Sequence, residues 1–144
     1  MSIKKILFLL LAVTLFCCCS SDDGDGNNLN GFEKFEGTWG PVSYTLKGKV
    51  YPCNPEYPNI NNIDRLVFLR WEDDKVIIRY ECFYNGEWKH RTDKTFIWHN
   101  GKFYKIKLVG SSNVEMGEPY TAITIDGGFM YNSDYEGVKF KKVR

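Results

Sequence analysis

The chain has almost no net charge and few histidines. Its 144 residues include 19 Lys and Arg, 18 Asp and Glu, and 2 His. Nucleic-acid binding needs a strong basic footprint, so no nucleic-acid partner is expected. A zinc site is not expected either, because neither His90 nor His99 falls in a ligand spacing. We interpret both histidines as ordinary solvated or packed residues.

The sequence also lacks the common catalytic motifs. It has no Gly-x-Ser-x-Gly elbow, no phosphate-binding glycine loop and no His-Glu-x-x-His. Carboxylates are plentiful, but a pair such as Asp73 and Asp74 is typical of a turn rather than of general acid–base catalysis. Because neither a nucleophile nor a base can be named, we predict a protein that is not an enzyme and that uses no cofactor or metal.

Long hydrophobic runs are lacking too, except for a short one near the N-terminus. Lys4 and Lys5 precede the apolar segment Ile6–Phe16, which is broken only by Thr14. A bilayer core of roughly 30 Å needs about 20 residues of helix, so this segment is too short for a permanent transmembrane span. Its basic front and the small residues at its end predict a secretory signal.

Three cysteines at the end of this segment indicate a lipoprotein signal over residues 1–19. A thiol at the cleavage point can accept a diacylglycerol, which then anchors the mature chain to a membrane. We predict Cys19 as the lipid attachment site, since the small Cys18 stands directly before it. Cys18 is the alternative, because Leu15 lies three residues before it, where an apolar residue is usual.

Residues 20–31 are predicted to form a flexible acidic tether. The stretch Ser20–Asn28 contains no apolar residue, so it cannot repay the entropy of ordering. The run Cys-Ser-Ser-Asp-Asp resembles the export signal that sends lipoproteins of the Bacteroidota to the outer face of the outer membrane. The resemblance implies a lipid-anchored protein of the outer membrane that faces the cell surface. An anchor facing the periplasm, with an acidic stretch that only solvates the chain, is the alternative.

Residues 32–144 remain as one domain rich in aromatic residues and glycine. Removing Lys4 and Lys5 with the signal leaves seventeen basic and eighteen acidic residues from Ser20 on. About 110 residues suit a single domain with one core. Aromatic residues make up 16% of the chain and glycines number 13, while long apolar patterns of helical period are missing. This combination predicts an all-β domain.

Two cysteines lie within this domain, Cys53 and Cys82. In an oxidising periplasmic or surface compartment, such a pair is most simply interpreted as a disulfide. On the chain-entropy model, closing a loop of about thirty residues stabilises the fold by roughly 3–4 kcal/mol. Two independent thiols are the alternative.

Alternating polarity and tight turns divide the domain into about eight strands. Asn85-Gly86 and Asn100-Gly101 are hairpin signals, because both residues tolerate the positive φ of a type I′ turn. The segment 51–62 is predicted to be a loop, because it holds three prolines and four asparagines. The predicted strands cover residues 42–47, 65–71, 75–84, 87–99 (one strand or more), 102–109, 120–125, 129–131 and 137–143.

This order of strands favours an up-and-down antiparallel β-barrel, with a two-sheet β-sandwich as the alternative. Consecutive strands joined by short turns suit a barrel, which closes on itself and leaves no free edge. Within the strand 102–109 the alternation predicts one inward and one outward set. The inward residues are Tyr104, Ile106 and Leu108, and the outward ones are Lys105 and Lys107.

The start of the domain, Phe35-Glu36-Gly37-Thr38-Trp39, resembles that of the lipocalin-like lipoproteins of the Bacteroidota. Gly37-Thr38-Trp39 corresponds to the Gly-x-Trp of lipocalins, and the segment 120–131 with its last strand fits the end of that family. The resemblance implies an eight-stranded barrel whose closed end is plugged by the tryptophan, and it implies no particular ligand. The sequence departs from the family in its proline-rich loop 51–62 and in its charged middle strands.

The aromatic residues of the predicted strands and loops suggest two hypotheses for the function. In the first, a lipid-anchored, non-enzymatic binding protein holds a small hydrophobic or amphipathic molecule in a barrel cavity. The cavity candidates, which could equally fill a core, are Tyr44, Tyr80, Phe96, Trp98 and Tyr104. In the second, the barrel is solid and loops at the cell surface bind glycan or protein through tyrosines. Those loop tyrosines are Tyr51, Tyr57, Tyr131 and Tyr135.

Overall fold

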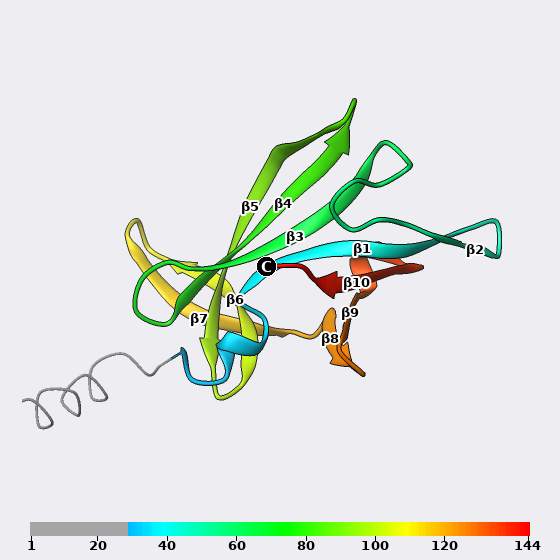
Figure 1. Cartoon of the computed structure of the whole chain (residues 1–144). Coiled ribbons are helices and arrows are strands. Elements are labelled where there is room, and N and C mark those ends of the chain that lie inside the picture. Colours follow the sequence, from blue (N-terminus) through cyan, green and yellow to red (C-terminus); the bar gives the residue numbers. More distant parts are fainter. Residues whose placement is uncertain (1–28) are drawn as a thin grey trace, which may run out of the picture.

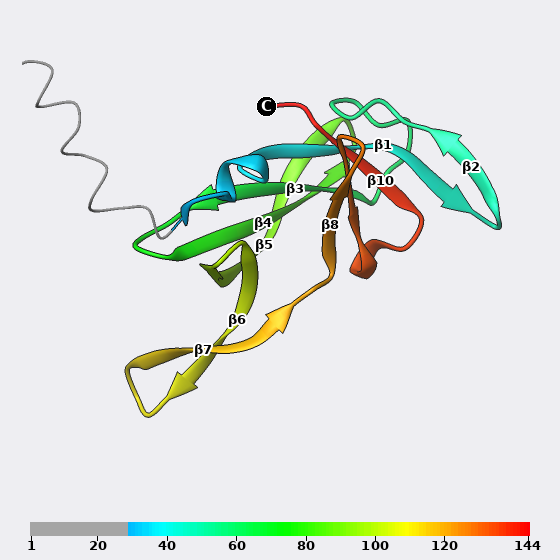
Figure 2. The same ribbon diagram turned by 90° about the horizontal axis from the view of Figure 1, so that it is seen from below.

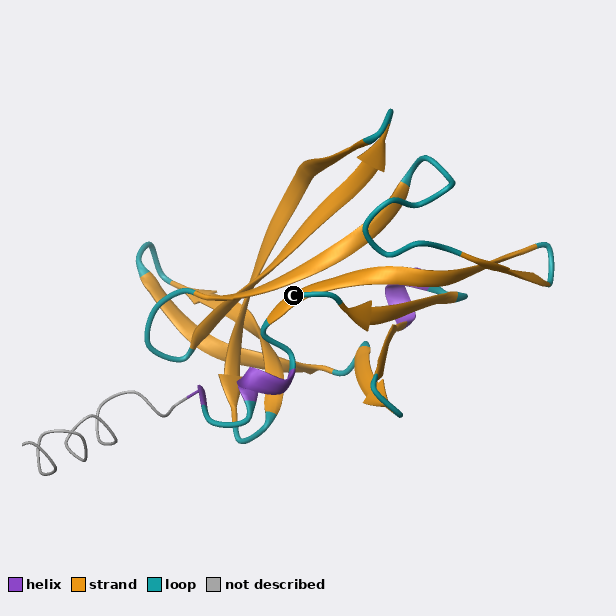
Figure 3. Ribbon diagram, viewed as in Figure 1, coloured by secondary structure: helices purple, strands orange, loops and turns teal. Residues whose placement is uncertain are grey.

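A computed structural model describes residues 29–144. The predicted signal, its attachment sites Cys19 and Cys18, and most of the predicted tether lie outside the described residues. Two short 3₁₀ helices accompany a set of strands in this range: η3 (Phe32–Lys34) precedes the first strand and η4 (Ser133–Tyr135) precedes the last one (Figure 3). The strands are β1 (Gly37–Leu46), β2 (Lys49–Pro52), β3 (Ile63–Arg70), β4 (Lys75–Tyr84), β5 (Glu87–His99), β6 (Lys102–Val109), β7 (Asn113–Tyr120), β8 (Ile123–Asp126), β9 (Phe129–Asn132) and β10 (Val138–Lys142). No helix in this part of the chain is long and apolar enough to cross a membrane.

The strands form one antiparallel sheet that curls into a nearly closed barrel (Figures 1 and 2). Their order along the sheet is β7-β6-β5-β4-β3-β1-β10-β9-β8, and β2 pairs with β1 outside this path. Strands adjacent in sequence pair from β3 to β7 and from β8 to β10, which is an up-and-down arrangement. The predicted all-β barrel is therefore confirmed. Its two free edges are β7 and β8, and we refer to the opening between them as the seam.

Two strands were not predicted. β2 lies partly in the segment expected to be a loop. β7 has the sequence Asn-Val-Glu-Met-Gly-Glu-Pro-Tyr, in which the alternation of Val114 and Met116 is cut short by Gly117, Glu118 and Pro119. β7 is an edge strand, so it needs no buried face along most of its length. The strand expected over 120–125 is divided, because β7 ends at Tyr120 and β8 begins at Ile123.

One end of the barrel is closed by aromatic side chains. Phe32 of η3 is fully buried and packs edge-to-face on Trp98 at 5.6 Å between ring centroids. Phe103 lies 5.0 Å from Phe35 and 4.9 Å from Trp98 in the same manner. Trp39 is buried in this cluster, and its indole N–H donates to the Phe35 carbonyl at 2.6 Å. Side chains therefore fill this end, which we call the closed end.

Leu29 and Asn30, which fall in the stretch 20–31 predicted to be a tether, take part in the packing of the closed end. Leu29 is buried in the core cluster. The carbonyl of Asn30 accepts a hydrogen bond from the Trp98 indole at 2.9 Å. These residues thus belong to the closed end, although their polar neighbours in sequence suggested a tether.

The predicted orientation of β6 is wrong at Tyr104 and Lys105, whereas Ile106, also predicted to face inward, is half-buried and lines the pocket beside Phe96. Phe103 is buried and pairs with Trp98, whereas Tyr104 pairs with Ile97 on the opposite face. Lys105 pairs with the core residue Phe96 and so lies on the inner side. A shift of one position moves every side chain of a strand to the other face. The alternation of lysines with apolar residues was visible, but it did not reveal which set meets the core.

The predicted disulfide is not formed in the structure, where Cys53 and Cys82 are free thiols. Cys53 follows β2, and its amide donates to the carbonyl of Val42. Cys82 lies in β4, where it pairs with Asp64 of β3. Cys53 is thus hydrogen-bonded to β1, whereas Cys82 pairs with β3. Burial raises the thiol pKa of both residues.

Candidate functional site

A layer of polar and aromatic side chains lies inside the barrel, next to the apolar core. We call it the tyrosine layer. It is built from β3, β4, β5, β7 and η4, which contribute Asp64, Tyr80, Arg91, Tyr120, Asp134 and Tyr135. Tyr80 and Tyr120 both contact the core cluster, so the layer marks the boundary between the packed and the open half of the barrel.

Arg91 reaches the layer because β5 contains a bulge. The register between β4 and β5 passes from Tyr80–Thr92 to Glu81–His90, so Arg91 is the extra residue. A bulge re-aims the side chain of its extra residue. The guanidinium of Arg91 forms an ion pair with Asp64, and it donates to the Tyr135 hydroxyl at 2.7 Å. Asp64 is only 6% exposed, so this ion pair supplies the partner that its buried carboxylate needs.

A second contact crosses the seam. The hydroxyl of Tyr120, the last residue of β7, donates to the carboxylate of Asp134 in η4 at 2.6 Å. The amide of Asp134 in turn donates to the side chain of Asn132 at 2.9 Å, which caps η4. This side-chain bridge ties the end of the edge strand β7 to η4, which lies between β9 and β10.

Three tyrosines of the layer are held as neutral hydroxyls. Burial raises the pKa of Tyr80, Tyr120 and Tyr135, and the neighbouring carboxylates Asp134 and Asp64 add to the effect on Tyr120 and Tyr135 respectively. The Tyr80 hydroxyl is buried and has no hydrogen-bond partner within residues 29–144. The rings of Tyr80 and Tyr135 stack at 6.1 Å, and those of Phe96 and Tyr120 at 4.6 Å. The layer therefore offers flat aromatic faces and neutral O–H groups.

Two lysines lie beside these rings, and one of them, Lys94, lies over the ring of Tyr80. Lys94 pairs with the core residue Ile78, and its ammonium lies 5.0 Å from the centre of the Tyr80 ring. Lys105 of β6 pairs with Phe96. Both side chains line a pocket of about 490 Å³, to which Tyr120 and Asp134 also contribute. Within the described residues neither ammonium takes part in an ion pair.

A neighbouring pocket of about 420 Å³ lies on the other side of the layer. It is lined by Asp64, Arg91, Tyr135 and Cys82, together with the start of β3 and of β10. The charges here are already paired, since Arg91 binds Asp64. The free positive charge of the barrel mouth is thus concentrated on the side of Lys94 and Lys105.

The predicted cavity residues do not form one site. Tyr80 belongs to the tyrosine layer and Phe96 packs beside it, whereas Trp98 is buried in the closed end. Tyr44 stacks on Tyr51 at 5.4 Å, at the hairpin of β1 and β2, which projects from the barrel (Figure 1). Tyr104 lies on the outer face of β6 beside His99.

The residues that sequence reasoning missed are mostly charged. The inward position of Arg91 could not be predicted, because the alternation of polar and apolar residues in β5 does not reveal the bulge. Lys94 and Lys105 could be assigned to strands from the sequence. Assigning them to the inner face would have required knowing that Phe96 and Phe103, which share their parity, face the core. Tyr135 was noted only as a loop tyrosine, and Tyr120 and Asp134 carried no signal at all.

No group of three or more His, Cys, Asp or Glu within residues 29–144 is arranged to hold a metal ion. The arrangement of the site can bind an anionic group at two ammoniums and an apolar or aromatic body on the rings below. Comparisons with protein-family models, with curated proteins and with solved structures found no match to this chain.

Proposed function

We propose that the protein is a non-enzymatic, lipocalin-like binding lipoprotein that holds a small amphipathic anion in the open half of its barrel. One observation carries the proposal: Lys94, whose ammonium lies over the Tyr80 ring, and Lys105 line one pocket with Phe96 and Tyr120, and neither lysine has an ion-pair partner in the described residues. Charged groups inside a barrel are costly unless they face water or a ligand. A ligand with an apolar body and an anionic head would satisfy both parts of this surface.

The proposal changes the ligand expected from the sequence. The closed end is filled by Phe32, Phe35, Trp98 and Phe103, so an entirely apolar molecule has no dry chamber there. The ligand would instead lie against the tyrosine layer, in contact with solvent on one side. The neutral Tyr80 hydroxyl, which has no hydrogen-bond partner among the described residues, could donate to one of its polar atoms.

The proposed location rests on the sequence. The lipobox-like cysteines imply acylation at Cys19, or at Cys18 as the alternative, and the acidic run after them favours the outer face of the outer membrane. On this proposal the membrane is a partner through the lipid alone, and the barrel collects its ligand from the medium outside. A periplasm-facing anchor would leave the ligand site unchanged.

Two fluorescent probes of different charge test the ligand class. Residues 20–144, which include the whole packed barrel, should bind the amphipathic anion anilinonaphthalene sulfonate in a saturable manner and the neutral probe Nile red more weakly. Replacing Lys94→Glu or Lys105→Glu should weaken binding of the anion about tenfold, since a charge-assisted hydrogen bond contributes about 1.5–3 kcal/mol.

Two variants serve as matched controls. Lys141→Glu makes the same charge change on an exposed part of β10, and Tyr104→Lys changes the outer face of β6. Both should leave binding unchanged. Absence of saturable binding to the folded domain, or equal losses for Lys105→Glu and Lys141→Glu, would contradict the proposal.

A further inference from the structure

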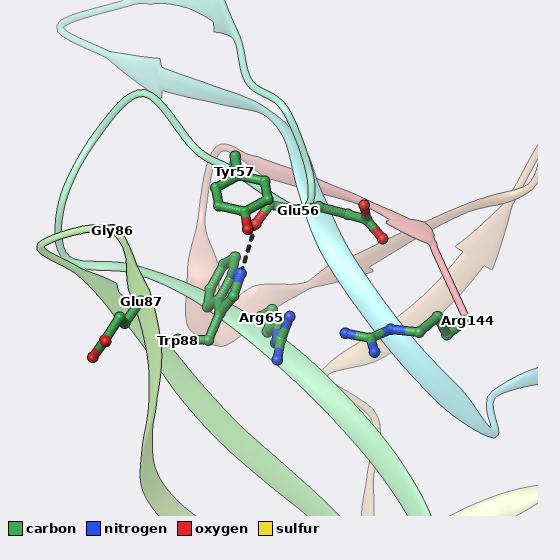
Figure 4. Close-up of a pocket in the computed structure, with 7 residues that line it drawn as sticks. All are labelled: Glu56, Tyr57, Arg65, Gly86, Glu87, Trp88 and Arg144. Atoms are coloured by element: carbon green, nitrogen blue, oxygen red, sulfur yellow. Dashed lines mark hydrogen bonds between the residues drawn. The ribbon is translucent and has the colours of Figure 1, made fainter.

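A separate hollow lies on the outer surface, where the loop after β2 meets the hairpin of β4 and β5 (Figure 4). Its volume is about 550 Å³. Side chains from the loop, the hairpin, β3 and the last residue of the sequence line it, namely Glu56, Tyr57, Arg65, Glu87, Trp88 and Arg144. We call it the loop groove. It shares no lining residue with the pockets beside the tyrosine layer.

The loop that forms one wall is held in place by its own side chains and by the hairpin. The side-chain oxygen of Asn54 accepts from the amides of Glu56 and Tyr57 at 3.0 and 3.2 Å. The Trp88 indole donates to the Glu56 carbonyl at 2.8 Å, as the dashed line in Figure 4 shows. A Cβ at Gly40 would overlap the carbonyl of Pro55, so only glycine lets the loop lie this close to β1. The groove is therefore preorganised, which lowers the entropic cost of binding.

Two aromatic rings flank the groove. Trp88 packs edge-to-face on Phe83, with 5.2 Å between the ring centroids. The Arg65 guanidinium lies 4.5 Å from the centre of the Trp88 ring. Tyr57 is 71% exposed, the largest exposed fraction of any aromatic side chain in residues 29–144. An exposed aromatic face on a loop held in place by its own hydrogen bonds offers a flat apolar surface to a ligand.

The charges around these rings nearly cancel. Arg65 is already bound to Glu81 at 2.6 Å. Within the described residues no ion pair engages Glu56, Glu87 or Arg144. An anionic ligand would meet the two carboxylates, and a cationic one would meet the guanidinium. A polyhydroxylated neutral ligand can donate to the carboxylates, accept from the guanidinium and lay its C–H face on the rings.

We propose that the loop groove binds a neutral saccharide, with Tyr57 as the main stacking residue and with Glu56, Glu87 and Arg144 as partners for its hydroxyl groups. The site is distinct from the barrel site and does not depend on it. A protein that carries both could bind a surface glycan through its loops while its barrel mouth remains free.

Affinity electrophoresis in native gels tests this proposal with defined probes. Residues 20–144 should be retarded by at least one neutral polysaccharide among amylopectin, mixed-linkage β-glucan and galactomannan, and not preferentially by the anionic polygalacturonate. Tyr57→Ala should weaken the retardation about tenfold, as expected for truncation of a central aromatic contact. Tyr57→Phe keeps the ring and should retain it.

Tyr131→Ala is the matched control, because it removes another exposed tyrosine on β9. It should leave retardation unchanged. The proposal is overturned if none of the neutral polysaccharides retards the folded protein, if polygalacturonate alone does, or if Tyr57→Ala and Tyr131→Ala behave alike. Because Tyr57 is exposed, thermal unfolding of Tyr57→Ala should match the parent, which separates a binding loss from misfolding.

Discussion

The two halves of the barrel use the same strands for different purposes. At the closed end, β5 presents Trp98 and β6 presents Phe103 to a dry cluster of rings. Further along, the same two strands present Lys94 and Lys105 to an open pocket above the tyrosine layer. The closed end therefore provides the stability of the fold, and the open end can carry charges that a packed core would exclude. Substitutions in the two halves should therefore differ in their effect on the free energy of unfolding.

The largest effect on folding should come from the closed end. Phe32→Ala removes a fully buried ring that packs on Trp98 and Phe103, and such a truncation costs about 3–5 kcal/mol. The free energy of unfolding from urea titration measures it. A loss below about 1 kcal/mol would mean that η3 does not plug the barrel.

An intermediate effect is expected within the tyrosine layer. Arg91→Ala leaves the buried Asp64 without its ion-pair partner, which should cost about 2 kcal/mol because Arg91 itself is half exposed. The matched control Arg79→Ala breaks the exposed pair with Asp93 and should cost less than about 1 kcal/mol. Equal costs for the two variants in urea unfolding would show that the bulge does not place Arg91 as described.

The layer should also make the fold sensitive to alkaline pH. The folded-state pKa values of Tyr80, Tyr120 and Tyr135 are raised, so the stability that they contribute is fully present below the unfolded tyrosine pKa of about 10 and is lost as the pH rises above it. Tyrosinate absorbance should show that three of the nine tyrosines do not ionise with the others and titrate only as the protein unfolds. A single transition near pH 10 for all nine in the folded protein would contradict this.

The smallest effect concerns the cysteines. Since Cys53 and Cys82 are free thiols, adding a reductant should leave the melting temperature unchanged. Mass spectrometry after alkylation of the unfolded, unreduced domain should find two labels on residues 20–144. Finding no label would establish the disulfide that the sequence suggested and would contradict the structure at this point.

The strands bounded by Asn-Gly turns could be predicted from the sequence. β4, β5 and β6 begin and end where the pattern placed them, and Asn85, Gly86, Asn100 and Gly101 all have positive φ as the hairpin turns require. β7 was not predicted, because the short alternation of Val114 and Met116 is followed by Gly117 and Pro119, which are typical of a turn or of an edge strand.

The candidate site was far less predictable than the fold. Placing Lys105 inside the barrel required knowing which face of β6 meets Phe96, and this depends on pairing across strands rather than on local pattern. Placing Arg91 required the bulge of β5. The layer also joins residues from β3 to η4 that are distant in the sequence, such as Asp64 and Tyr135.

The location of bound anilinonaphthalene sulfonate tests the central claim most directly. Amide chemical shifts of residues 20–144 followed by NMR during a titration would report which half of the barrel the probe contacts. The largest changes should fall on residues around Lys94, Lys105, Tyr120 and Asp134, with little change at Phe32 or Trp39. Changes centred on the closed end, or spread over the outer face of β6 around Tyr104, would contradict it.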